Sequence, residues 1–189
     1  MDERKIKMVN KLTPVGSAGF SVVKEARGFK GSDENKQFSQ GLILDTSVGE
    51  GFLQEIQAEA NRLHAKELEN AKARGKSVRY AQPVINYKDT DDGRMLFTFK
   101  RREIEGAPPV LDATNKPFSG YITREHKLQI AFELRPYVMA NIFGVTLKLL
   151  AIKVMDSQLT EESAANLFGA APTAQKPATK PNSSIEDLF

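Results

Sequence analysis

Hydrophobic and polar residues alternate with a period of two over several stretches of this chain. The clearest case is residues 126–134, where Leu128, Ile130, Phe132 and Leu134 are separated by polar or small residues. Such spacing places the apolar side chains on one face and is typical of a half-buried β-strand. Alternation, or a high content of β-branched and apolar residues, predicts five further strands, at residues 5–12, 18–26, 37–45, 94–103 and 144–155.

One long segment has helical periodicity instead. In residues 50–74, apolar side chains such as Phe52, Ile56 and Leu63 recur mostly three to five residues apart, with Glu and Lys on the other face. Gly75 follows as a typical helix terminator. The chain thus has at least five antiparallel strands, with one helix between the early ones. This order predicts a mainly β protein, and more specifically a five-stranded OB-fold barrel with an inserted long α-helix.

The composition changes from residue 156 onward. Residues 159–169 have the pattern of a short helix, and residues 169–184 hold three prolines among small and polar residues. The second stretch is typical of a disordered linker. We therefore expect a folded domain over residues 1–155, and a short helix, a flexible linker and an acidic tail over residues 156–189.

The charge is divided unevenly between these two parts. The chain has a net charge of +3, but residues 1–155 carry +6 and the last 34 residues carry −3. A basic domain with an acidic extension indicates a polyanion-binding surface and a tail that can be attracted to it. A solvated surface without a nucleic-acid partner would give a similar balance.

Several other classes of function find no support in the sequence. There is no apolar run of about 18 residues, so no membrane span is expected. Cysteine is absent, which excludes disulfides and thiolate metal sites and fits a cytoplasmic location. The stretch "RGKS" lacks the earlier glycine of a phosphate-binding loop, because position 70 is Asn70. We expect a protein that is not an enzyme and that has no metal and no cofactor.

Basic and aromatic residues occur together at several places, as single-strand binding requires. Cations follow the phosphates and exposed rings stack on bases. The phosphate-contacting candidates are Arg27, Lys30, Arg79, Lys100, Arg101, Arg102 and Arg135. The ring candidates are Tyr137, Tyr80, Phe29 and Tyr87, followed by Phe99, which shares a strand face with Phe97 and could instead belong to the core.

In the order of its parts, the chain resembles the single-stranded-DNA-binding proteins of tailed-phage replisomes. The likeness covers most of residues 36–155, from "QGLILD" through the long charged helix, "RYAQPVINYKDTDDG", "MLFTFK", "HKLQIAFEL" and "RPYVMAN" to "GVTLKLLAIKVM". The ending "EDLF" is a second match, since these proteins end in an acidic tail closed by Phe. Met139 is a departure, because a second aromatic residue is expected after "PY".

The resemblance implies an OB-fold protein that coats and protects single-stranded DNA without sequence choice during phage replication or recombination in the host cytoplasm. It implies that Tyr137 contacts a base and that Phe99 and Lys100 belong to a basic-aromatic strand. The tail would recruit a polymerase, a primase–helicase or a nuclease, and homodimers are common in the family. Its partner-binding residues would be Ile185, Glu186, Asp187, Leu188 and Phe189.

One alternative from another class remains open. The barrel could be a protein-interaction module that recruits a host or phage factor through its tail and binds no nucleic acid. In that case the basic and aromatic residues would be ordinary surface and core residues. The two hypotheses differ in whether the barrel has an exposed surface on which cations and rings lie together.

Overall fold

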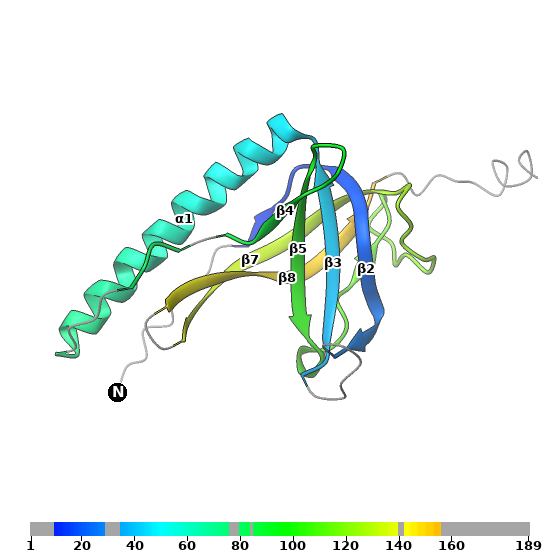
Figure 1. Cartoon of the computed structure of the whole chain (residues 1–189). Coiled ribbons are helices and arrows are strands. Elements are labelled where there is room, and N and C mark those ends of the chain that lie inside the picture. Colours follow the sequence, from blue (N-terminus) through cyan, green and yellow to red (C-terminus); the bar gives the residue numbers. More distant parts are fainter. Residues whose placement is uncertain (1–9, 29–34, 76–79, 84, 140–141, 156–189) are drawn as a thin grey trace, which may run out of the picture. The chain divides into compact units, whose positions relative to one another are not determined.

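The structure is a computed structural model, which describes residues 10–28, 35–75, 80–83, 85–139 and 142–155 (Figure 1). The strands are β1 (Lys11–Leu12), β2 (Gly16–Arg27), β3 (Gln37–Leu44), β4 (Tyr87–Asp89), β5 (Met95–Arg102), β6 (Val110–Leu111), β7 (Lys127–Met139) and β8 (Ile142–Val154). The helix α1 (Thr46–Ala73) lies between β3 and β4, and the 3-10 turn η2 (Glu103–Glu105) follows β5.

Five of these strands close into a ring. The order around it is β2, β3, β5, β8 and β7, with β7 pairing again with β2. All of these pairings are antiparallel except that of β5 with β8, which is parallel. The predicted five-stranded OB-fold barrel with one inserted helix is therefore confirmed. Three short strands pair onto the ring from outside it: β1 on β7, β4 on β5 and β6 on β8.

The period-two alternation divides the barrel wall into an inner and an outer face. Phe97 and Phe99 of β5 and Phe132 of β7 are each 0% exposed and meet inside the barrel, where the rings of Phe99 and Phe132 lie 5.3 Å apart edge to face. The alternate residues of the same strands, such as Thr98 and Lys100, are exposed. A closed ring buries the apolar side of each strand and leaves the polar side on the surface.

The helix α1 covers this core with one of its faces. Phe52 packs edge to face against Phe97 and Phe132, with ring centroids 5.0 and 5.7 Å apart. The helix begins four residues before the predicted start, with Asp45 as its N-cap and a first hydrogen bond from the Gly49 amide to the Asp45 carbonyl. It ends as predicted, because Gly75 adopts a φ of +71°.

The strands β7 and β8 continue past the ring as a two-stranded hairpin. The predicted strand 126–134 extends to Met139, and Pro136 lies in the part of β7 that pairs with β8 alone. A strand with one open edge tolerates proline, since the missing N–H breaks no second ladder. Phe143 of this hairpin packs on His64 of α1 at a ring distance of 5.1 Å, so the helix supports the hairpin (Figure 1).

Some predictions differ from the structure or fall outside it. Of the predicted strand 5–12, only Lys11–Leu12 is a described strand. The short strands β4 and β6 and the turn η2 were not predicted, because two or three residues are too short for a periodic signal. Residues 156–189, with their predicted helix, linker and tail, lie outside the described residues. Among the described residues, no helix has both the length and the hydropathy of a membrane span.

Candidate nucleic-acid interface

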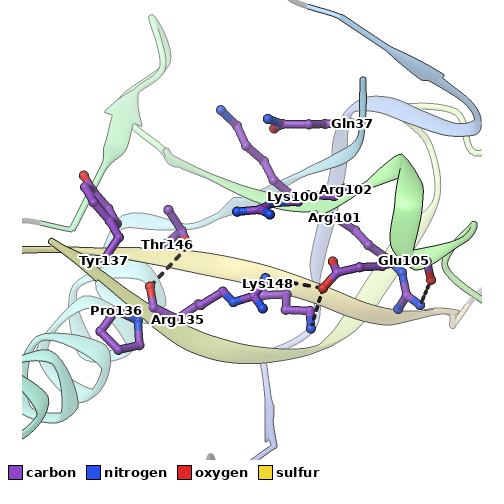
Figure 2. A pocket seen from close by; sticks show the side chains of 10 residues that line it. All are labelled: Gln37, Lys100, Arg101, Arg102, Glu105, Arg135, Pro136, Tyr137, Thr146 and Lys148. Carbon is purple, nitrogen blue, oxygen red and sulfur yellow. Dashed lines mark hydrogen bonds and ion pairs between the residues drawn. The ribbon is translucent and has the colours of Figure 1, made fainter. Parts of the chain in front are cut away.

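Two adjoining hollows lie along β5 and β8, the first bordered also by β7 and the second by β4. The first has a volume of about 350 Å³ and is lined by Gln37, Lys100, Arg101, Arg102, Glu105, Arg135, Pro136, Tyr137, Thr146 and Lys148 (Figure 2). The second has a volume of about 390 Å³ and is lined by Asn86, Tyr87, Lys88, Leu96, Thr98, Lys100, Val145, Thr146 and Leu147. Lys100 and Thr146 line both hollows, so we treat them as one groove.

The register of the strands brings the polar side chains of the groove together. Lys100 of β5 and Lys148 of β8 are paired in the parallel ladder, and Thr146 lies two residues before Lys148 on the same face. Arg135 of β7 is opposite Thr146. The first hollow thus contains five cationic side chains and a single carboxylate, that of Glu105. Such a surface attracts polyanions.

Tyr137 presents an exposed aromatic ring at one side of the groove. Its side chain is 41% exposed, and its strand partner is Gly144. A Cβ atom on Gly144 would lie only 2.2 Å from the Tyr137 Cζ, so the ring lies across the bare backbone of β8. Glycine at position 144 therefore makes room for the ring.

Tyr87 provides a second exposed ring, in the other half of the groove. It is 40% exposed and stacks on the buried Phe97, with centroids 5.9 Å apart and an interplanar angle of 29°. The contact with Phe97 fixes the ring from the core side. Each hollow of the groove is thus lined by one exposed aromatic side chain, and Lys100 lines both hollows.

The cations of the groove differ in how they are bound. Lys100 and Arg102 are exposed and form no ion pair with any described residue. Arg101 points to the inner side, where its guanidinium donates to the carbonyl oxygens of Glu105 at 2.6 Å, Gly106 at 2.8 Å and Leu150 at 3.3 Å. Arg101 therefore holds the end of the barrel together, whereas Lys100 and Arg102 are available to a ligand.

Glu105 is the acidic member of the groove. Its Oε1 accepts from Lys148 Nζ at 3.0 Å and from Arg135 Nη1 at 3.3 Å (Figure 2). Lys148 also pairs with Glu133 at 3.2 Å. Partial burial acts to raise the pKa of Glu105. The hydrogen bond and charge of Lys148, the backbone N–H of Arg102 and the charge of Arg135 together outweigh it and hold this pKa below its usual range. Glu105 is therefore ionised at neutral pH.

The structure sorts the sequence-predicted site residues into groups. Those that line the groove are Tyr87, Lys100, Arg101, Arg102, Arg135 and Tyr137. Arg27 ends β2 opposite Gln37 and lines a different hollow, next to residues 118–122. Tyr80 is half-buried near His64 and Phe143, behind the hairpin. Phe29, Lys30, Arg79 and the tail residues Ile185, Glu186, Asp187, Leu188 and Phe189 lie outside the described residues.

One of these predictions is wrong. Phe99 is 0% exposed and belongs to the core, so it is not available for stacking on a base. The alternation of β5 explains the error, because Phe99 and Lys100 point to opposite faces of the same strand. Of the two possibilities that the sequence left open for Phe99, the core is correct.

Sequence reasoning also missed several groove residues. Thr146 and Lys148 occupy alternate positions of the predicted strand 144–155, and that alternation was the available signal. Glu105 gave no such signal, because it lies in the short turn η2 instead of a strand. Within the described part of the chain, no three His, Asp or Glu side chains are grouped in a way that could hold a metal ion.

Several solved structures have a similar fold. The gp2.5 single-stranded DNA binding protein of bacteriophage T7 aligns with a TM-score of 0.62 at 17% identity, covering 77% of this chain and 91% of that protein. The single-stranded DNA-binding protein of bacteriophage Enc34, in complex with single-stranded DNA, aligns with a TM-score of 0.56 at 12% identity. The alignment covers 77% of this chain and 85% of that protein. A further structure of the Enc34 single-stranded DNA-binding protein aligns with a TM-score of 0.54 at 10% identity, covering 82% of this chain and 89% of that protein.

The fold is shared with phage single-stranded-DNA-binding proteins. At these identities the likeness shows the arrangement of the chain, and function must be argued from the groove itself. No model of a known protein family matches the sequence, and no curated protein sequence matches it either.

The contacts of Arg101 predict a structural role that can be measured. Arg101→Lys keeps the charge but removes the forked donors, which leaves carbonyl groups of Glu105, Gly106 and Leu150 without their partner. We expect a loss of about 1–3 kcal/mol in the free energy of unfolding, measured by urea denaturation. The matched variant Arg102→Lys, at an exposed position, should change stability by less than about 0.5 kcal/mol. Equal stability of the two variants would contradict this role.

Proposed function

We propose that the protein binds single-stranded DNA without sequence choice. The observation that carries the proposal is the groove, where Lys100 and Arg102 share one outer face with the exposed ring of Tyr137. Neither cation forms an ion pair with a described residue, and the exposed Tyr87 lines the adjoining hollow from the core side of β5. Cations that follow a phosphate backbone and rings that stack on any base are the two components of nonspecific single-strand binding. The groove therefore suits an unpaired strand better than a small molecule.

The position of the groove in the barrel supports the same function. In OB-folds, oligonucleotides bind on the face of the second and third barrel strands and on the loops that flank it. Here those strands are β3 and β5, and Gln37, Lys100 and Arg102 from them line the groove. The flanking loops are the segments between β2 and β3 and between β7 and β8. The Enc34 protein, which has a similar fold, has been solved in complex with single-stranded DNA.

The wider role that we propose is the coating and protection of DNA during phage replication or recombination in the host cytoplasm, without enzymatic activity. The phage origin of the structures with a similar fold supports this setting. The C-terminal residues 183–189 would recruit a polymerase, a primase–helicase or a nuclease. Leu188 and Phe189 would fill an apolar site on that partner, and Glu186 and Asp187 would meet basic groups around it. A homodimer is compatible with this role.

The groove predicts a strong dependence of DNA binding on salt. Three cations at the surface, Lys100, Arg102 and Arg135, would displace counterions from phosphates, and single strands give a slope of about −0.7 per contact. We expect log K for labelled oligo-dT to fall with log salt with a slope of about −2 or steeper, measured by fluorescence anisotropy. Equal affinity for a duplex of the same length, or binding that is insensitive to salt, would reject the function and favour a protein-interaction module.

The exposed ring of Tyr137 predicts a stacking contribution. Tyr137→Ala should weaken oligo-dT binding by about 1–3 kcal/mol, the usual value for one stacked base. Gly144→Ala should also weaken binding, because the new methyl group displaces the same ring. Tyr121 is the matched control: it is 76% exposed but lies outside the groove, with Lys24 over its ring at 3.5 Å. If Tyr121→Ala weakens binding as much as Tyr137→Ala does, the groove is misplaced.

The proposed role of the tail predicts that DNA binding and partner recruitment can be separated. Deletion of residues 183–189 should leave oligo-dT affinity unchanged or tighter, because these residues carry two carboxylates and no cation. The same deletion should abolish co-purification with the replication partner. Ser183→Ala with Ser184→Ala, which keeps the apolar and acidic groups, serves as the control for recruitment. A clear loss of DNA affinity in the deletion variant would reject this division of roles.

A further inference from the structure

Glu105 has an unusual position for an acidic side chain. It lies within the cationic half of the groove, where all the other charged lining residues are Lys or Arg. Its Oε1 accepts from Arg135 Nη1 and from Lys148 Nζ, which come from the neighbouring strands β7 and β8 (Figure 2). A single carboxylate oxygen thus joins two cations that face the groove.

This arrangement has the chemistry of a phosphate site. Carboxylate and phosphate oxygens accept charge-assisted hydrogen bonds from the same donors, typically at about 2.7–2.9 Å, and guanidinium groups suit both. The contacts of Glu105, at 3.0 and 3.3 Å, are longer than this, so the carboxylate is not held at the shortest distance these donors allow. A non-bridging oxygen of a phosphodiester in the place of Oε1 would meet the same two donors.

The local charges show why such a site needs Glu105 to move. Arg135 and Lys148 are balanced by two carboxylates, those of Glu105 and Glu133. With both carboxylates in place the cluster is neutral and offers no net attraction to a phosphate. When the carboxylate of Glu105 turns away, the cluster carries one net positive charge.

The backbone holds Glu105 in this place while its side chain can rotate. Arg101 fixes the carbonyl groups of Glu105 and Gly106, so the turn η2 has a defined position. The carboxylate itself is bound by Arg135, Lys148 and the backbone N–H of Arg102, and its side chain is 23% exposed. A change of rotamer is therefore enough to release the two cations, without opening of the turn.

We propose that Arg135 and Lys148 form a phosphate subsite that Glu105 occupies in the free protein and that a phosphodiester of the bound strand takes by displacing it. This inference rests on the proposed function and adds a specific element to it. Glu105 acts as an internal competitor that weakens binding and makes it more easily reversible. Lys100 and Arg102, which have no such competitor among the described residues, make the first contacts with the strand.

The subsite is tested by Glu105→Gln, which keeps the shape of the side chain and removes its charge. With labelled oligo-dT and the full-length protein, we expect binding at low salt to become on the order of threefold to tenfold tighter. The salt slope should stay close to that of the wild-type protein, because the strand makes the same phosphate contacts in both complexes and only the competing carboxylate is lost. A purely structural Glu105 would not tighten binding when its charge is removed.

The matched control is Glu103→Gln. Glu103 belongs to the same turn, its substitution changes the net charge equally, and it forms no ion pair with a described residue. Its effect on affinity should be less than twofold. In addition, the gain from Glu105→Gln should disappear in an Arg135→Gln background, because the released donor is then absent.

The outcomes separate this inference from the function on which it rests. Wild-type protein that fails to bind oligo-dT rejects both. Wild-type protein that binds, with Glu105→Gln no tighter than Glu103→Gln or weaker than wild type, rejects the subsite alone. A gain that persists in the Arg135→Gln background also rejects it, because the effect would then be a general one of charge.

Discussion

The parallel pairing of β5 with β8 is the constraint on which the other features depend. Together with the antiparallel pairings of the other neighbours, this pairing closes the ring, and it is formed by Lys100 and Lys148. Closure forces the apolar side of every strand inward, where Phe97, Phe99 and Phe132 fill the interior. It also aligns Lys100 with Lys148 on the outside. The core and the groove are thus formed by opposite faces of the same strands.

Much of this wall could be predicted from local patterns. The alternation in residues 126–134 and 144–155 identifies the long strands, and the helical spacing in residues 50–74 identifies α1. These signals are strong because one face of each element is buried, which selects apolar residues at a fixed period. The OB-fold followed from their number and order. The placement of Lys100 and Arg102 on the strand face opposite Phe97 and Phe99 followed from the same alternation.

The rest depends on contacts between distant segments, which no local pattern contains. The sequence could not decide whether Phe99 is a core or a surface ring, because that depends on which side of β5 the closed ring buries. Tyr137 is exposed because Gly144, seven residues later, leaves space for its ring. Glu105 lies in the groove because the Arg101 side chain binds the carbonyl groups of Glu105 and Gly106, at the end of the turn η2. Each of these facts requires the register of the strands.

The most direct test of the account is to map the DNA on the barrel by NMR. Amide chemical shifts of the full-length protein would be followed during titration with oligo-dT. We predict that the largest chemical-shift changes fall on the strand positions of the groove, around residues 98–102, 135–137 and 144–148. Changes confined to the hollow between β2 and residues 118–122, or the absence of any saturable change, would contradict it.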